Sequence, residues 1–319
     1  MPPLNTLEYA KIYQAQLDKQ AIQIATSGWM EPNSSQVRYN GGDEVRIPKL
    51  DMDGLGDYDR DDGFVQGSAT LVWQTKTLTQ DRGRTFQIDP MDVDETAFVP
   101  QMGTIMGEFQ REKVIPEIDA YRYSKIATYG IANSKNKAYT PAAASILKEL
   151  QNDIADIQDI TGNTTDLVIT MAIPVLNILN QSTELSRTLT VTDFAQGGIQ
   201  TKVSSINGIP IIPVVSARMK TEYQFLTGGT GQKGGGFKPG PNALGINWII
   251  CPRRMPIAIS KTDVIRFFDP MTNQRAHAWR ADYRKYHDLW ILDNQMPGLR
   301  VSLDGTPDPG DPGDPGTGG

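Results

Sequence analysis

The longest stretch with a helical pattern of apolar residues lies between about residues 94 and 129. Its apolar positions recur at i, i+3, i+4 and i+7, namely Met102, Ile105, Met106, Phe109, Ile115, Ile118 and Ile126. This spacing predicts a helix that lays one face on a core. Pro116 removes a backbone hydrogen bond in the middle of that pattern, so we expect a kink or break near residues 112–116. The predicted helix is longer than the average helix of a globular domain, and we call it the strut.

Alternating apolar and polar residues predict a β-hairpin ahead of the strut. The segments 44–50 and 67–79 have period-two alternation and are rich in Val, Thr and Trp. An acidic, glycine-rich stretch connects them, and one more strand follows before the helix. Because an isolated two-stranded ribbon is marginally stable in water, we expect this hairpin to complete its folding against a neighbouring subunit.

The chain before the hairpin is expected to form an arm. Residues 5–25 repeat apolar positions at helical spacing, and the following polar stretch, which begins at Trp29, has little of its own to bury. An arm of this kind gains little by folding on itself, so a partner is implied.

After the strut the pattern indicates a second helix and then a compact α/β layer. Residues 141–158 have an apolar stripe of Ile146, Leu147, Leu150, Ile154 and Ile157. From Asp166 short strands and helices alternate, and residues 228–241 form a glycine-rich loop that we expect to be exposed and flexible. Further strands are predicted at 166–172, 209–215, 247–251, 255–260, 264–268 and 277–292, and the tail from Asp304 is expected to be disordered.

Composition narrows the classes of function. The chain has 319 residues, a net charge of -6, two histidines and a single cysteine, Cys251. An acidic chain does not suit a dedicated nucleic-acid-binding surface, although it can enclose DNA without gripping it. One cysteine excludes an intramolecular disulfide framework and fits a reducing cytosol. No apolar run is long enough to span a bilayer and no secretory signal is found, so we expect no membrane association.

The order of these segments resembles the major capsid proteins of tailed bacteriophages, which have the Hong Kong 97-like fold. The residues that carry the resemblance are EIDAYRYSKIA at 117–127, SSINGIPIIPVVSARM at 204–219, NALGINWIICPRRMPIAI at 242–259 and the segment 277–303. The resemblance covers roughly residues 1–303 and implies an α+β fold. It places an N-terminal arm at 1–36, an extended loop at 37–84, a peripheral domain at 85–160 and 251–303, an axial domain at 161–250 and the tail at 304–319.

That resemblance implies a structural protein and no enzyme. We expect the chain to assemble with itself into pentamers and hexamers of an icosahedral shell around double-stranded DNA, with no cofactor. A separate scaffolding protein, a portal and cement or decoration proteins are the implied partners. The implied location is the virion capsid, assembled in the host bacterial cytoplasm. An encapsulin-like compartment shell, a tail-tube or other virion protein and an acid/base hydrolase are the alternatives.

Several residue clusters invite a chemical function. Asp51, Asp53, Asp57 and Asp62 have spacing similar to an EF-hand loop, but Leu55 occupies a ligand position and Asp62 replaces the bidentate Glu, so a solvated hairpin tip is preferred. The loop 228–240, with Lys233 and Lys238, lacks the Gly-Lys-Ser/Thr ending of a phosphate-binding loop.

Other polar residues have simpler explanations than catalysis. The acid/base candidates Asp89, Asp92, Asp94 and Glu95 precede a helix, where its dipole favours them. Packing is the simpler role for His277 and His287. Lys49 and Lys76 lie where an inter-subunit cross-linking lysine would have to be, but nothing in the sequence identifies its asparagine or glutamate partners.

Charged residues near the strut and the hairpin are the candidates for contacts between subunits. Basic residues on one subunit could fix register against acidic hairpin tips on a neighbour. The candidate contact residues are Asp57, Asp59, Asp61, Asp62, Trp73, Arg82, Arg84, Arg111, Lys113 and Arg122, with Lys125 beside them.

Overall fold

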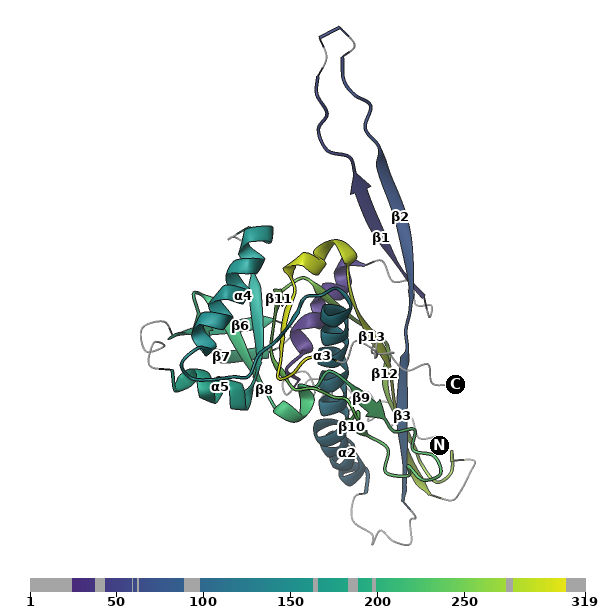
Figure 1. Ribbon diagram of the computed structural model, residues 1–319. Helices are drawn as coiled ribbons and strands as arrows, with labels where there is room; N and C mark the ends of the chain where they lie inside the picture. The colour runs from purple at the N-terminus through teal and green to yellow at the C-terminus, as the bar shows by residue number, and fades with distance from the viewer. Residues whose placement is uncertain are drawn as a thin grey trace.

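A computed structural model shows an α+β protein with a body and a projecting ribbon (Figure 1). The structure describes residues 25–37, 44–58, 60–61, 63–88, 98–162, 166–182, 189–196, 199–273 and 278–307. The expected helix at 5–25, the first residues of the strut and most of the acidic tail therefore lie outside the described residues.

A seven-stranded sheet forms one half of the body. Its order is β4-β14-β11-β5-β8-β7-β6, in which β5 and β8 are parallel and β11 is antiparallel to both of its neighbours. The apolar runs of the central strands are buried, as their lack of alternation requires. The strands are β4 (Asn136–Ala138), β5 (Leu167–Ala172), β6 (Leu189–Gln196), β7 (Ile199–Ile206), β8 (Ile209–Val214), β11 (Ile246–Pro252) and β14 (Arg300–Leu303).

Two helices accompany this sheet, α4 (Ile146–Thr161) and α5 (Ile173–Asn180). The predicted stripe of α4 is confirmed, since all five of its apolar residues are buried in the largest core cluster. The expected division between a peripheral and an axial domain stays a prediction. The sheet draws β4 and β14 from the ranges 85–160 and 251–303, and its other strands from 161–252.

The strut is observed as a helix whose middle turn is irregular. It consists of α2 (Phe98–Phe109), a π-helical turn η3 (Gln110–Val114) and α3 (Ile115–Ala132). Pro116 has no N–H to donate to the preceding turn, and the π-helical turn lies directly before it. A kink or break was predicted here: the chain stays helical, so there is no break, and the π-helical turn is the irregularity that lies in its place.

The strut packs closely on the body at its C-terminal end. Ile115, Ile118 and Ile126 are buried as predicted, whereas Ile105 is exposed. A Cβ atom at Gly130 would lie 2.7 Å from Cγ2 of Val301, so a side chain there would push α3 away from β14. Glycine at this position allows the helix to approach the sheet.

A three-stranded antiparallel sheet forms the other half of the body, in the order β12-β13-β3. It consists of β3 (Gln80–Ile88), β12 (Pro256–Phe268) and β13 (Trp279–Ile291). The two strands expected at 255–260 and 264–268 are one strand, with a register shift between Ser260 and Thr262. Such a bulge interrupts the alternation of side chains, which explains why the pattern indicated two separate strands.

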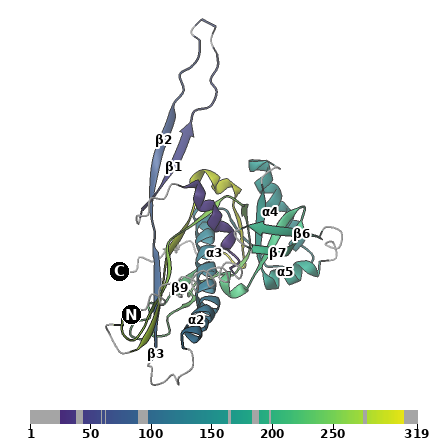
Figure 2. The ribbon, with the colours of Figure 1, turned by 180° about the vertical axis from the view of Figure 1, so that it is seen from behind.

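The predicted hairpin is confirmed and projects away from the body (Figures 1 and 2). It consists of β1 (Glu44–Met52) and β2 (Ala69–Thr77), which pair antiparallel over their whole length. β3 begins three residues after β2 ends, and in Figure 2 the two strands follow each other in nearly one line.

Two loop predictions are wrong. The stretch after Trp29 was expected to bury little, yet Gly28–Gln36 is a 3-10 helix, η1, in which Trp29 and Met30 are fully buried. The loop 228–241 was expected to be flexible throughout, but Phe237–Pro239 forms β10 and pairs with β9 (Tyr223–Phe225). Two further 3-10 segments are η5 (Ser216–Arg218) and η6 (Asp293–Gly298). None of the helices in the described ranges is long and apolar enough to cross a membrane.

Candidate functional site

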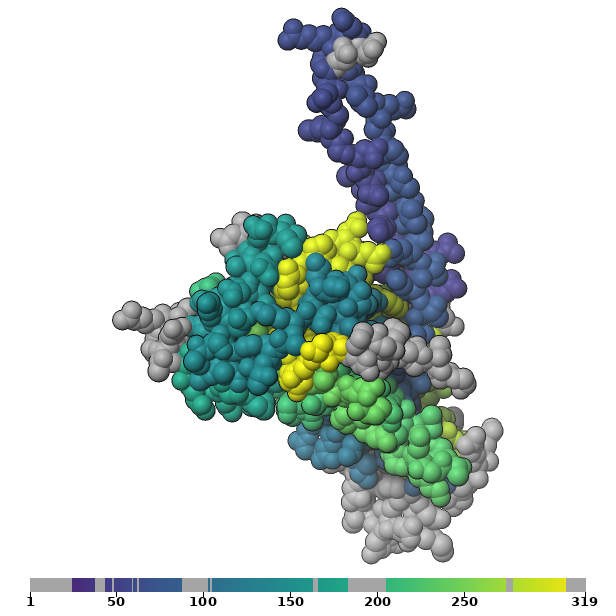
Figure 3. Space-filling model, viewed as in Figure 1, coloured from purple at the N-terminus to yellow at the C-terminus, as the bar shows by residue number. Residues whose placement is uncertain are grey.

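The outer half of the hairpin exposes large apolar side chains. Phe64 is 90% exposed, Met52 66% and Trp73 55%. In Figure 3 the hairpin stands clear of the body in the space-filling view. The other exposed large apolar residues of the hairpin are Leu50, Leu55, Tyr58, Val65, Leu71 and Val72. Large exposed apolar side chains gathered on one projecting segment mark a site of interaction with another molecule.

The inner half of the same hairpin is firmly joined to the body. Val45, Ile47 and Leu78 are buried in one cluster with residues of β12 and β13, among them Ile257 and Trp290. Alternation on β1 points these side chains to one face, where the sheet covers them. The root of the hairpin is therefore part of the core.

Hydrogen bonds from η6 fix the hairpin just above this root. The amide nitrogen of Gln74 donates to Oδ2 of Asp293 at 2.6 Å, and that of Asn294 donates to the Leu50 carbonyl oxygen at 3.2 Å. Lys49 lies 3.6 Å from the same Asp293 carboxylate, and both side chains are exposed. Beyond these contacts, no further hydrogen bond or ion pair joins the ribbon to the body among the described residues.

The acidic tip of the hairpin does not gather into a metal site in the described part of the chain. Asp51, Asp53 and Asp57 are exposed, and no group of three or more possible metal ligands occurs among the described residues. Oδ2 of Asp53 accepts a hydrogen bond from the Ser68 backbone N–H at 2.7 Å, so this carboxylate supports the hairpin backbone. Asp61 is exposed as well, whereas Asp59 and Asp62 lie outside the described residues.

Most of the candidate basic residues are engaged within the chain. The guanidinium of Arg82 donates to Glu117 at 2.6 Å and to the backbone oxygens of Leu226 and Gly236 at 3.1 Å each. Arg84 donates to the Lys233 carbonyl oxygen at 2.9 Å, and Arg111 pairs with Glu108 on its own helix. Lys113 is exposed on the π-helical turn.

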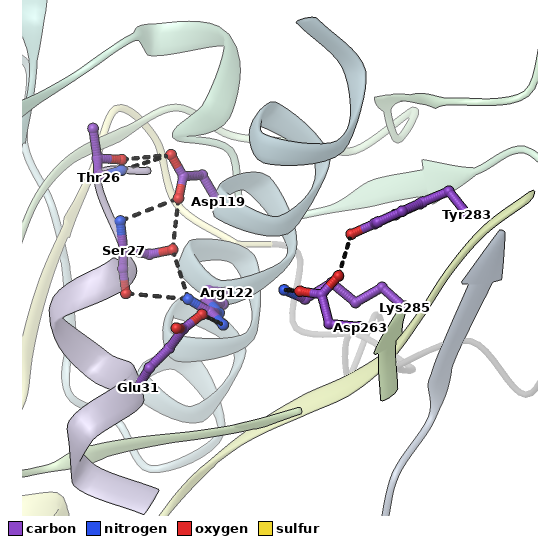
Figure 4. Close-up of polar contacts among 8 residues, drawn as sticks. All are labelled: Thr26, Ser27, Glu31, Asp119, Arg122, Asp263, Tyr283 and Lys285. Carbon is purple, nitrogen blue, oxygen red and sulfur yellow. Dashed lines mark hydrogen bonds and ion pairs between the residues drawn. The ribbon is translucent and has the colours of Figure 1, made fainter. Parts of the chain in front are cut away.

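Arg122 is a correction to the predicted contact set, because it lies in the interior of the subunit (Figure 4). Its side chain is 1% exposed, donates to the Ser27 backbone oxygen at 3.2 Å and pairs with Glu31 at 2.8 Å. Burial alone would raise the pKa of Glu31, but the positive charges of Arg122 and Lys285 outweigh it and lower that pKa. A buried, paired guanidinium is unavailable to a neighbouring subunit.

Asp119 completes this polar cluster between α3 and the segment that enters η1 (Figure 4). Its carboxylate accepts hydrogen bonds from the backbone and hydroxyl groups of Thr26 and Ser27, at 2.6 to 3.1 Å. Arg218 also donates to it at 3.0 Å. These hydrogen bonds thus hold the segment that enters η1 against α3. Figure 4 also shows Asp263, which accepts from Tyr283 at 2.9 Å and Lys285 at 2.6 Å.

A second buried cluster lies where β2 passes into β3. Asp288 is fully buried and accepts hydrogen bonds from the Thr79 backbone and hydroxyl groups at 3.0 and 2.9 Å, and from the Tyr121 hydroxyl at 2.6 Å. His287 packs edge-on against Tyr121, and burial with the nearby cations Lys285, Arg122 and Arg82 holds the pKa of His287 well below its usual range. His287 is therefore a neutral packing residue at pH 7, as expected, while His277 lies outside the described residues.

The remaining sequence candidates are not brought into one site. Asp89, Asp92, Asp94 and Glu95 lie outside the described residues. Lys76 lies opposite Val45 on the hairpin. Lys233 and Lys238 lie on the loop and ribbon that Arg82 and Arg84 contact through backbone oxygens.

Comparison with known structures decides the fold. The chain superposes on a subunit of the mature capsid of bacteriophage PhiM1 with a TM-score of 0.58 and 10% identity, covering 83% of this chain and 82% of that one. The capsid of the cyanophage P-SCSP1u gives a TM-score of 0.55 at 8% identity, with 82% and 83% covered. This is the fold of a phage capsid protein. No family model and no curated protein sequence matches the chain.

The elements of this chain are arranged in space much as they are in these capsid structures. Sequence identities of 8 to 14% with similar structures mean that the likeness lies in backbone architecture rather than in shared residues. The α+β class predicted from the sequence is confirmed, and the similarity extends over most of the chain.

Proposed function

We propose that this protein is the major capsid protein of a tailed phage and that it assembles with itself into the pentamers and hexamers of an icosahedral shell. The observation that carries the proposal is the projecting hairpin, whose outer half exposes large apolar side chains on a capsid fold. A neighbouring copy of the same chain is the partner that repetition in a shell supplies to every hairpin.

The hairpin performs this role because its two halves differ. The buried root and the η6 hydrogen bonds set the direction in which the ribbon leaves the body. Burying an exposed Leu, Val or Phe side chain contributes about 1.5–3 kcal/mol, so a few such residues make a substantial contact. Repeated around a closed shell, contacts that are modest one by one add up to a stable assembly.

The remaining parts of the proposal concern the interior and the partners of the shell. A net charge of -6 suits a wall that encloses double-stranded DNA without gripping it. We include in the proposal a separate scaffolding protein, a portal, cement or decoration proteins and assembly in the host bacterial cytoplasm. The charged residues Asp57, Asp61 and Lys113 are exposed and stay candidates for contacts between subunits.

Electron microscopy of the purified protein tests the assembly. We expect negatively stained wild-type protein to show icosahedral shells or rings of capsomers. The double variant Leu71→Asp with Trp73→Asp should remain as small particles, because two charges interrupt the apolar face of the hairpin. The matched control is Met271→Asp, which places the same charge on an exposed apolar residue in the turn after β12.

Two results would contradict the proposal. One is a wild-type protein that stays a small monodisperse monomer at every concentration, and the other is a hairpin variant that assembles as well as the control. Nuclease-protected double-stranded DNA inside particles from infected cells supports the phage assignment. Particles that instead enclose an enzyme support the compartment-shell alternative.

A further inference from the structure

A cleft of about 710 Å³ opens on the body beside the strut. Its walls are β3, the π-helical turn with the start of α3, and the loop between β9 and β10, and β13 supplies its floor. The shell proposal uses no residue of this cleft except Lys113, which it keeps as a candidate for contacts between subunits. Its lining has two features that together identify an occupant, a set of aromatic rings and an excess of positive charge.

The aromatic rings form one continuous face in the cleft. Phe86 and Phe109 meet edge to face with centroids 4.9 Å apart, and Phe109 meets Tyr283 in the same way at 6.1 Å. Phe86 and Phe109 are half-buried, so part of each ring faces the open space. Rings arranged like this form grooves that bind proline-rich segments in an extended conformation.

The charges of the lining leave a positive excess. Asp81 pairs with Arg284 at 2.5 Å, and Glu117 pairs with Arg82 at 2.6 Å. Arg84 and Lys113 have no carboxylate partner in the described part of the chain, and Lys233 on the adjoining loop has none there either. Glu112 is the exposed carboxylate that opposes them. An anionic occupant is therefore favoured.

Side chains of β3 hold the loop that forms one wall of the cleft in a defined position. Arg82 holds both ends of the loop through the Leu226 and Gly236 oxygens, and Arg84 holds its middle through Lys233. A Cβ atom at Gly228 or Gly235 would lie 3.2 or 3.3 Å from Nη1 of Arg84, and both glycines have positive φ angles. Glycine at these positions lets the loop lie directly on the arginine and so keeps the cleft shaped.

We propose that this cleft binds the acidic, proline-rich C-terminal tail of the same chain. The tail reads DGTPDPGDPGDPGTGG from Asp304, with a carboxylate and a proline in every repeat of three and no basic residue. Proline restricts the chain to extended, polyproline-like backbone, so binding it in a groove costs little conformational entropy. The carboxylates suit Arg84, Lys113 and Lys233, and the proline rings suit the aromatic face.

The end of the described chain lies within reach of the cleft. Gly305 packs against Leu244, whose backbone exchanges hydrogen bonds with Thr221. From Thr221 the chain runs through β9 to Leu226 at the cleft, a path of about 17 Å at ~3.3 Å per residue. Residues 308–319 can span up to about 40 Å when extended, which is more than this path requires.

Cysteine cross-linking in the full chain tests the proposal. Gly313→Cys in the tail is combined with Glu112→Cys in the cleft lining, and the matched control combines it with Lys148→Cys, an exposed position on α4. The native Cys251 is buried and gives little background. We expect intramolecular cross-linking to be about tenfold faster to position 112 than to position 148, since binding raises the local concentration of the tail.

Charge and salt separate binding from accidental proximity. Changing Asp308, Asp311 and Asp314 to Asn, or adding about 0.5 M salt, should bring the rate at position 112 down to that of the control. Lys113→Gln should slow cross-linking at position 112 severalfold, because it removes a positive charge from the cleft. Lys125 lies beside the buried Asp288 and offers the tail no such charge. Equal rates at the two positions, a rate that ignores the aspartates, or cross-links that form only between chains would overturn the proposal.

Discussion

The two halves of the hairpin share one strand pair but differ completely in what covers them. Near the body, Val45 and Ile47 are buried against β12 and β13, while farther out Leu71 and Trp73 on the same ribbon are exposed. Both halves alternate apolar and polar residues, but the apolar positions change face between them: Val45 and Ile47 lie on one face of the ribbon, and the pair of Leu50 and Leu71 lies on the other. The contrast teaches that the root stabilises the subunit and the outer half is free to stabilise contacts between subunits.

The largest expected effect comes from the body, at the buried cluster that fixes the N-terminal segment. Asp119→Ala leaves Arg218 and the Thr26 and Ser27 groups without their acceptor, which should lower the free energy of unfolding by about 3–5 kcal/mol. Urea unfolding followed by circular dichroism measures it. The control Asp282→Ala removes a less buried pair with Arg280 and should cost much less. Equal losses would contradict the structural difference.

The next effect compares the two halves of the hairpin directly. Ile47→Ala at the root should destabilise the subunit by about 2 kcal/mol or more, because it leaves a cavity among buried side chains. Leu71→Ala on the outer half should change the free energy of unfolding by about 0.5 kcal/mol at most. The same urea experiment on unassembled protein distinguishes them, and a costly Leu71→Ala would show that the outer half is covered within its own subunit.

A smaller effect is the pH dependence of the free energy of unfolding that His287 causes at the joint between the hairpin and the body. His287 has a folded pKa well below its ordinary 6.5, so the unfolded chain binds the extra proton first as pH falls. Its contribution to stability is complete above pH 6.5 and is lost below it, at up to about 1.4 kcal/mol per pH unit. Unfolding measured at pH 7.5 and 5.5 should show this loss, and His287→Asn should flatten it. Glu31 contributes in the same direction only below its ordinary pKa of 4.5.

The smallest expected effect tests where the boundary between the root and the outer half of the hairpin lies. Gln74→Ala removes one exposed hydrogen bond to Asp293 and should cost about 0.5–1 kcal/mol in the unassembled subunit. The measurement that matters is hydrogen exchange along β1 and β2, which should rise beyond the η6 contacts and stay unchanged at the root. Thr75→Ala, an exposed neighbour on β2, serves as the control. A uniform rise over both halves would disprove the boundary.

The sequence was sufficient for elements whose apolar residues keep one period over many positions. The stripe of α4, the hairpin strands and the long strut all followed from spacing. The bulged strand β12 was divided in two because its register shift breaks the alternation. The 3-10 helix η1 was missed because its two buried residues, Trp29 and Met30, stand among polar neighbours.

The polar clusters were harder to predict because they join residues about ninety positions apart in the chain, as Ser27 and Asp119 do. A signal was nevertheless present for Arg122. It lies four residues from both Ile118 and Ile126, so the helical period places it on the buried face of α3 rather than on a solvated one. Asp119 lies four residues after Ile115 and shares this placement. A charged residue within an apolar stripe thus predicts an internal partner.

At Thr79 the end of the hairpin is connected to the interior of the protein through a buried carboxylate. Asp288 accepts hydrogen bonds both from Thr79, between β2 and β3, and from Tyr121 on the strut. Asp288 thus ties the end of the hairpin to the strut, in addition to the buried contacts of Val45 and Ile47 with β12 and β13. One buried carboxylate therefore links the position of the hairpin to the position of α3.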